Sequence, residues 1–246
     1  MSNSWFKQPP ARAKPDDQSR NRRTWRSNSR RAPEPRARRK AGLLLLGLLI
    51  VALLIVTALL ISENSKLNQL REKRAQEAAD HERAIGYYAS MRRQSGTADI
   101  IDKYAREYNV NPSFISAVIS RESHYDEKAE SSVGARGLMQ IMEGTGQWIA
   151  GKLGYQDYSY DRLYEPDLNI QFGTWYLSYL SENLAGDPVM IASAYHAGLR
   201  SAKLWALHHA DNQQFLRVDE IPKEDTRDYV GKVMNAYALY YEYDNR

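Results

Sequence analysis

The sequence predicts a mainly α-helical globular domain, with at most a small β-hairpin, preceded by one transmembrane helix. Seven segments beyond residue 90 carry apolar residues at the three- and four-residue spacing of a helix, and continuous strand patterns are hard to find. A separate run, residues 41–61, contains no charged residue and is long enough to cross a hydrocarbon core. These two observations indicate a helical domain attached to an apolar N-terminal segment.

Residues 1–40 are strongly basic and are predicted to be disordered. They contain thirteen Lys or Arg and three acidic residues, a net charge of +10, so residues 41–246 carry −6 of the total of +4. The segment is rich in Arg, Ser and Pro and has too few apolar residues to offset the entropy lost on ordering it. A basic tail can bind nucleic acid. The apolar run that follows offers a better explanation for the charge, and no nucleic-acid partner is expected.

The apolar run AGLLLLGLLIVALLIVTALLI, residues 41–61, is predicted to be a signal anchor. A helix rises about 1.5 Å per residue, so this run spans a hydrocarbon core of about 30 Å. The arginines end at its N-terminal side, which the positive-inside rule places in the cytoplasm. The basic and apolar regions are too long for a cleaved signal peptide. We therefore expect a single-pass protein of the cell membrane that contacts lipid through 41–61, with everything from Ser62 extracytoplasmic.

Residues 62–90 are densely charged and helix-prone, and are predicted to form a solvated stalk. Leu67 and Leu70 begin an apolar pattern that fades into Ala, which leaves a short dimerising coiled coil as the alternative.

The chain contains no cysteine. Disulfides, cysteine nucleophiles, thiolate metal sites and a lipoprotein anchor are therefore excluded.

Residues 91–246 have the length of one domain and contain the predicted helices. Thr97 is expected to cap the first of them. Asn111 as N-cap and Pro112 at the first helical position predict the start of the second. A short hairpin is possible near residues 123–136. The expected helices cover about 97–109, 112–122, 136–152, 168–184, 187–196, 199–209 and 225–242.

A glutamate occupies the apolar face of the predicted helix 112–122. Val118 and Ile119 lie on that face, and Glu122 follows them by four and three residues. A carboxylate there is paired, lies at the helix rim, or is kept for chemistry. An apolar setting raises the pKa of a carboxyl group, because it disfavours the anion, and a general acid near neutral pH needs that shift. The alternative is a helix-end glutamate half in solvent.

Five motifs give the sequence a family resemblance. In order they are Glu122-Ser123, GARGLMQIM (134–142), DLNIQFGTWYL (167–177), AYHAG (194–198) and DTRDYV (225–230). Their order and spacing resemble the lytic transglycosylase domain related to goose-type lysozyme, over about residues 95–244. The resemblance implies an α+β lysozyme-like fold made mainly of helices, and peptidoglycan glycan strands as the substrate.

The resemblance implies that Glu122 alone carries out the reaction. The β-1,4 bond between N-acetylmuramic acid (MurNAc) and N-acetylglucosamine (GlcNAc) is cleaved as Glu122 protonates the bridging oxygen. Glu122 then takes the proton from the MurNAc 6-hydroxyl, which attacks C1 and gives a 1,6-anhydro product without water. The N-acetyl group of the substrate is expected to stabilise the intermediate. General acid catalysis of this kind contributes about 10²–10⁴-fold. No cofactor or metal is implied.

The resemblance also assigns six residues to substrate binding: Ser131, Gln140, Met142, Tyr195, His196 and Tyr229. Tyr195 is expected to hydrogen-bond the catalytic carboxylate, and Ser131 to contact the sugar. Turn, core and packing roles remain open for Ser131, Met142 and Tyr229. His196 stands where Asn is usual and titrates near pH 6–7, so some pH sensitivity is expected. Glu143 replaces a usual Pro and loses a rigid helix-start residue.

Other functions remain open on the sequence alone. A lysozyme-like hydrolase would need a second carboxylate, such as Asp126 or Glu130. A non-catalytic wall-binding or scaffolding protein, with partners in a cell-wall or secretion complex, is the other alternative. His124, Asp126, Glu127 and Glu130 crowd the loop after Glu122. Their spacing matches no HExxH pattern, so an exposed acidic loop is favoured over a metal site.

Overall fold

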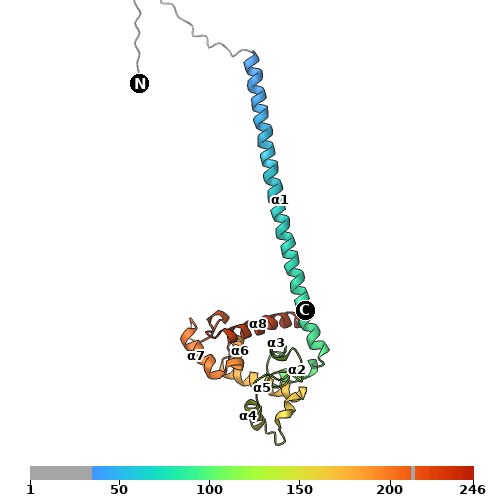
Figure 1. Cartoon of the computed structure of the whole chain (residues 1–246), viewed down its shortest axis with the longest axis vertical. Helices are drawn as coiled ribbons and strands as arrows, with labels where there is room; N and C mark the ends of the chain where they lie inside the picture. Colours follow the sequence, from blue (N-terminus) through green and yellow to red (C-terminus); the bar gives the residue numbers. More distant parts are fainter. Residues whose placement is uncertain (1–34, 212–213) are drawn as a thin grey trace, which may run out of the picture. The chain divides into compact units, whose positions relative to one another are not determined.

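The computed structural model describes residues 35–211 and 214–246, and these residues are mainly helical (Figure 1). Within them no strand forms, and the only pairings of β type are isolated antiparallel bridges, Glu130 with Arg136 and Arg136 with Ile141. The predicted fold class is therefore confirmed, while most of the predicted basic tail lies outside the described residues. The elements are α1 (Pro35–Gln94), α2 (Ala98–Tyr108), α3 (Pro112–Ser123), α4 (Glu143–Leu153), η1 (Tyr160–Tyr164), α5 (Pro166–Asn183), α6 (Pro188–Ala197), α7 (Leu199–His209), η2 (Val218–Glu220) and α8 (Glu224–Asp244).

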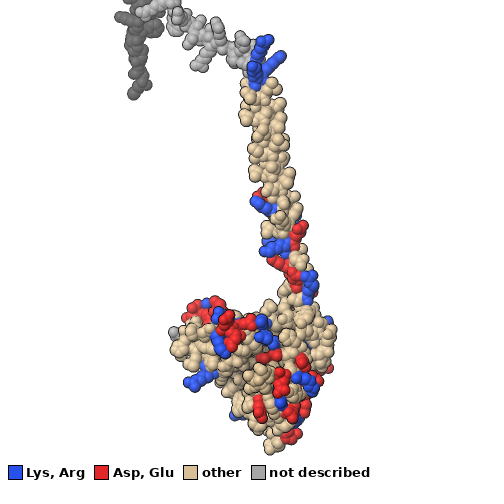
Figure 2. All heavy atoms as spheres, viewed as in Figure 1, with Lys and Arg blue, Asp and Glu red and all other residues tan. Residues whose placement is uncertain are grey.

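The chain divides into two compact units, Met1–Leu67 and Asn68–Arg246, with the boundary inside α1. The part of α1 in the first unit carries the apolar run 41–61, whose side chains are all exposed. Figure 2 shows this run as a band free of charged side chains. Among the described residues, α1 is the one helix long and apolar enough to cross a membrane by length and composition.

The last turns of α1 belong to the second unit. Ile85 and Ala89, four residues apart on one face, are buried. The ring of Tyr88 packs edge-on against Tyr240 of α8, with centroids 5.3 Å apart. The end of the predicted stalk 62–90 is therefore packed on the globular unit instead of standing in solvent.

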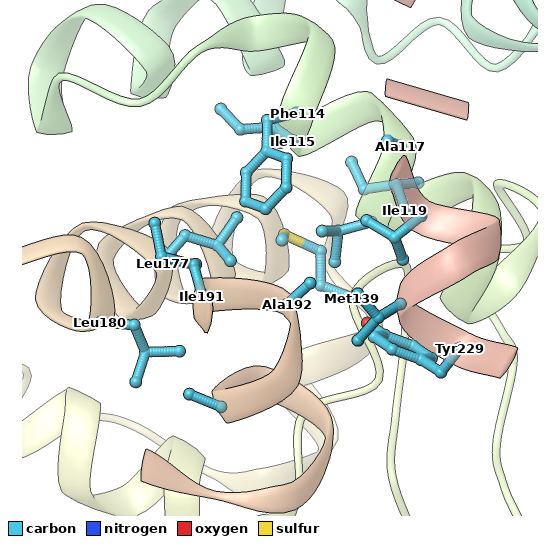
Figure 3. Packing of buried hydrophobic residues seen from close by; sticks show 14 of the residues in the cluster. Phe114, Ile115, Ala117, Ile119, Met139, Leu177, Leu180, Ile191, Ala192 and Tyr229 are labelled. Atoms are coloured by element: carbon cyan, nitrogen blue, oxygen red, sulfur yellow. The ribbon is translucent and has the colours of Figure 1, made fainter. Parts of the chain in front are cut away.

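Helix α3 lies at the centre of the second unit. It begins as predicted, because the Asn111 side chain accepts a hydrogen bond from the Ser113 N–H at 2.9 Å and Pro112 follows. Figure 3 shows Phe114 and Ile119 in one apolar cluster with residues of other helices. Helix α8 packs along α3, and its Val230, Val233, Ala236 and Tyr240 are buried. The helix ends at His124, in the left-handed conformation, which places Glu122 in its last turn.

The predicted helix 136–152 is wrong over its first seven residues. Residues 136–142 form turns and bridges, and α4 begins at Glu143. Gly137 has φ +72°, and a Cβ on it would lie 2.2 Å from the Leu163 carbonyl oxygen, so the backbone here is both left-handed and closely packed. Glu143 takes the first position of α4, where a carboxylate interacts favourably with the helix dipole.

Two smaller predictions also differ from the structure. Thr97 precedes α2, but its side chain makes no capping hydrogen bond to the helix. Its hydroxyl lies 2.7 Å from the Ser95 hydroxyl instead. The possible hairpin near 123–136 is reduced to the two isolated bridges. The remaining predicted helices form within a few residues of their expected bounds.

Candidate active site

Glu122 is half-buried in the last turn of α3, where one phenol hydroxyl reaches it. The Tyr229 hydroxyl of α8 donates a hydrogen bond to Glu122 Oε1 at 2.7 Å. Burial raises the pKa of Glu122 to about 7, although the Tyr229 hydrogen bond and the positive charge of Arg121 act to lower it. A carboxyl group with that pKa is protonated in roughly half of the molecules at neutral pH. Glu122 can therefore donate a proton and later accept one.

No second carboxylate lies close enough to Glu122 to change its pKa, within the part of the chain that the structure describes. Glu130 accepts hydrogen bonds from the Tyr164 hydroxyl at 2.8 Å and from Arg136 Nε at 3.1 Å, and these partners lower its pKa. Asp126 accepts a hydrogen bond from the Lys128 N–H within its own turn. Both candidates for the second carboxylate of a hydrolase, Glu130 and Asp126, thus make hydrogen bonds to other partners.

Tyr195 does not make the hydrogen bond expected of it. Its hydroxyl donates to the Met139 carbonyl oxygen at 2.7 Å, and Tyr229 is the residue that bonds Glu122. Residues 136–142 are not helical, so the Met139 carbonyl lacks a helical N–H donor and accepts the Tyr195 hydroxyl instead. Tyr195 still lies close to the site, since burial and the charge of Glu122 both raise its pKa.

Three side chains from three helices fix the backbone of Leu138 and Met139. Ser123 Oγ of α3 donates to the Leu138 carbonyl at 2.8 Å, and the Met139 N–H donates to Asn169 Oδ1 of α5 at 2.8 Å. Tyr195 of α6 holds the Met139 carbonyl. This loop is therefore a rigid wall beside Glu122.

The sequence analysis missed the roles of Ser123 and Asn169. Asn169 is fully buried between Leu168 and Ile170, and its Nδ2 also donates to the carbonyls of Arg136 and Leu163 at 2.9 and 2.7 Å. A buried amide must find such partners. An Asn within an apolar helical segment is the sequence signal that could have identified it.

Gln140, Met142 and Tyr195 come together around one cavity of about 210 Å³. Gln140 Nε2 donates to the carbonyls of Ala129 and Gly137 at 3.0 and 2.9 Å, which fixes the amide. Met142 is 43% exposed, so it is not a core side chain, in contrast to the fully buried Met139. The cavity thus offers a polar amide and an exposed thioether to a ligand.

His196 and Ser131 differ in their relation to Glu122. The His196 ring stacks on Tyr229, with centroids 4.4 Å apart, and its Nδ1 lies 3.1 Å from Thr226 Oγ1. Partial desolvation of the ring lowers the His196 pKa. Ser131 Oγ accepts a hydrogen bond from the Ala135 N–H at 2.9 Å and so closes a turn. A contact of Ser131 with sugar remains a prediction.

In the described part of the chain, no group of three or more His, Asp or Glu side chains is arranged to hold a metal ion. The described residues include the loop after Glu122, in which Glu130 and Asp126 make the hydrogen bonds given above.

The family model "Transglycosylase SLT domain" matches residues 99–216. This region, slightly under half of the chain, is similar to the transglycosylase SLT domain. The match includes Glu122 and the loop 136–142, and it ends before α8, so Tyr229 lies outside the matched region.

Curated relatives similar to this chain include soluble and membrane-bound proteins. The soluble lytic murein transglycosylase of Salmonella typhimurium is 34% identical over 147 residues, which cover 59% of this chain and 23% of the relative. The membrane-bound lytic murein transglycosylase C of Haemophilus ducreyi is 32% identical over 165 residues, covering 57% of this chain and 44% of the relative. The chain therefore spans less than half the length of these relatives.

Solved structures give the same relationship. The 70 kDa soluble lytic transglycosylase of Escherichia coli aligns with a TM-score of 0.55 at 31% identity, over 59% of this chain and 24% of that protein. An inactive mutant of the lytic transglycosylase Slt of Pseudomonas aeruginosa, in which Gln replaces a Glu, aligns with a TM-score of 0.55 at 30% identity, over 60% of this chain and 24% of that one.

Proposed function

We propose that the chain is a membrane-anchored peptidoglycan lytic transglycosylase that cleaves the MurNAc–GlcNAc β-1,4 bond and leaves 1,6-anhydro-MurNAc ends. The observation that carries the proposal is Glu122, a single carboxyl group with a pKa of about 7 and no second carboxylate acting on it among the described residues. The similarity to lytic murein transglycosylases supports the substrate class.

The proposed reaction uses both protonation states of Glu122. The protonated acid gives its proton to the bridging oxygen, the C1–O bond breaks, and GlcNAc leaves. The resulting carboxylate then takes the proton of the MurNAc 6-hydroxyl as that oxygen bonds to C1. The Tyr229 hydrogen bond stabilises the carboxylate between the two steps. A pKa near the working pH suits a group that must act first as acid and then as base.

The residues around Glu122 are proposed to bind the glycan. Gln140 and Met142 present polar and apolar atoms to the cavity beside Tyr195. His196 and Tyr229 form the stacked pair next to the carboxyl group. Ser131 is proposed to contact a sugar from the turn that follows α3.

The proposed organisation keeps the division made from the sequence. A cytoplasmic tail (1–40) and a membrane anchor (41–61) precede a stalk (62–90) and an extracytoplasmic domain (91–246). The long apolar helix supports the anchor, as do relatives named membrane-bound. The basic N-terminal flank supports the orientation.

The test is the mass of the products. The 246-residue chain, purified in detergent, would be incubated with purified peptidoglycan, and the muropeptides analysed by mass spectrometry. The proposal predicts product ends that are one water lighter than ordinary reducing ends. These ends should be absent when Glu122→Gln is used, provided that its circular dichroism shows an unchanged fold. Ordinary reducing ends would show a hydrolase instead. No products from the wild-type protein would favour the scaffolding alternative.

A further inference from the structure

A second pocket, of about 410 Å³, lies where α1, α3 and α8 meet. Its lining includes Tyr87 and Tyr88 of α1, Arg121 and His124 of α3, and Lys232 of α8. None of the described residues that line it is acidic. The α1 residues precede the start of the SLT match at residue 99, so one wall of the pocket comes from outside the matched domain.

The cationic groups of this pocket are incompletely satisfied. Arg121 Nε is buried and has no hydrogen-bond partner in the described structure, a costly arrangement for an N–H donor. Lys232 Nζ lies 2.8 Å from Asp228, but both side chains are more than half exposed, so solvent screens this pair. His124 adds an exposed imidazole at the end of α3. The pocket therefore brings together two permanently charged side chains, Arg121 and Lys232, and an exposed imidazole.

Arg121, which lines the pocket, also lies close to the tyrosine that bonds the catalytic carboxyl group. Arg121 precedes Glu122 in α3, and its guanidinium carbon lies 5.6 Å from the centroid of the Tyr229 ring. The hydroxyl of that ring donates to Glu122. Tyr229 therefore contacts both Glu122 and a residue that lines the basic pocket.

The substrate of the proposed function carries anions close to the bond that is cut. MurNAc, whose C1 reacts, bears on its lactyl group a peptide with free carboxylates. Carboxylates form strong, charge-assisted hydrogen bonds with guanidinium and ammonium groups. Tyr87 is 57% exposed and offers an apolar face to the aliphatic parts of such a peptide.

We propose that the pocket formed by Arg121, His124, Lys232 and the two α1 tyrosines binds the carboxylates of the peptide on the reacting MurNAc. The enzyme then prefers peptide-bearing strands to bare glycan. This inference rests on the proposed function and adds a specificity-determining site to it. It also gives the end of α1 a role in recognition.

The experiment compares kcat/KM of the full chain on peptide-bearing strands and on strands stripped of peptide by an amidase. Lys232→Ala should lower the ratio of the two values by roughly tenfold, the loss of about one charge-assisted hydrogen bond. Tyr87→Ala should lower the same ratio. Lys152→Ala removes an exposed lysine at the end of α4 and should leave the ratio unchanged. An unchanged ratio with Lys232→Ala would overturn the proposal.

A binding measurement separates this proposal from the proposed function. Isothermal titration of the inactive Glu122→Gln protein with the free acidic peptide reads the pocket without turnover. Binding that Lys232→Ala weakens roughly tenfold supports the pocket even if the wild-type protein cleaves no glycan. Absence of binding, in a protein that does cleave glycan, refutes the pocket alone.

Discussion

Replacing Tyr229 with Phe isolates the hydrogen bond that acts on Glu122. The ring, its stacking on His196 and its contact with Arg121 are kept, and only the hydroxyl 2.7 Å from Glu122 Oε1 is lost. A hydrogen bond to a charged group contributes about 1.5–3 kcal/mol. Because this one stabilises the anion, its loss should raise the Glu122 pKa from about 7 by about one to two units, at 1.36 kcal/mol per unit.

The assay is the pH dependence of kcat/KM. In the proposed mechanism activity requires protonated Glu122, so it should fall as pH rises through the Glu122 pKa, and in Tyr229→Phe that fall should move to higher pH by about one to two units. The rate on the plateau should drop roughly tenfold to a hundredfold, because the carboxylate formed by the first proton transfer loses the same stabilisation. The matched control is Tyr104→Phe, which removes a hydroxyl that donates to Asp167 of α5 at 2.7 Å and should leave the pH dependence in place. An alkaline limb that stays in place in Tyr229→Phe, or moves to lower pH, would refute this account of the Glu122 pKa.

Three further predictions follow from the site. The folded-state pKa of Glu122, about 7, is above its ordinary value of 4.5, so the wild type loses stability as pH rises between these values. Glu122→Gln should therefore be more stable than wild type at pH 8 by up to about 3 kcal/mol, with little gain at pH 4. Urea unfolding of both proteins at the two pH values measures this, and the same stability difference at pH 4 and pH 8 would disprove it. Asn169→Leu removes three hydrogen bonds to backbone groups of residues 136–163 and should cost roughly 3–5 kcal/mol with loss of activity; a thermal midpoint equal to wild type would contradict it. Desolvation lowers the His196 pKa, so the ring gains its charge only in acid, where a positive charge stacked on Tyr229 should favour the Glu122 anion and reduce activity. His196→Asn should therefore raise relative activity in acid, and an identical pH profile would rule this out.

Local signals predicted the start of α3 and the position of Glu122. Asn111 and Pro112 act within one turn of the chain, and their capping geometry forms as the residue types require. The apolar spacing before Glu122 likewise predicted burial, and burial is the main cause of its raised pKa. Both inferences depend on neighbours in the sequence.

Contacts between distant residues account for what the sequence did not reveal. Leu138, Met139 and Met142 have helical spacing, yet Asn169, thirty residues away, holds the Met139 N–H in a turn. Tyr229, and not Tyr195, bonds Glu122 because of how α6 and α8 pack around α3, which no local pattern encodes. The same holds for the pairing of Arg246 with Glu82, at 2.8 Å, across the second unit.

The pairing of Glu122 with Tyr229 joins residues 107 positions apart, and it has a consequence for the order of synthesis. Residues are added from the N-terminus, so α3 and its glutamate are made well before α8. Until α8 docks, one wall around the carboxyl group is missing, water reaches it, and its pKa stays near that of a free glutamate. The raised pKa of Glu122 is therefore established only after α8, the last of the described helices, has been made and has docked.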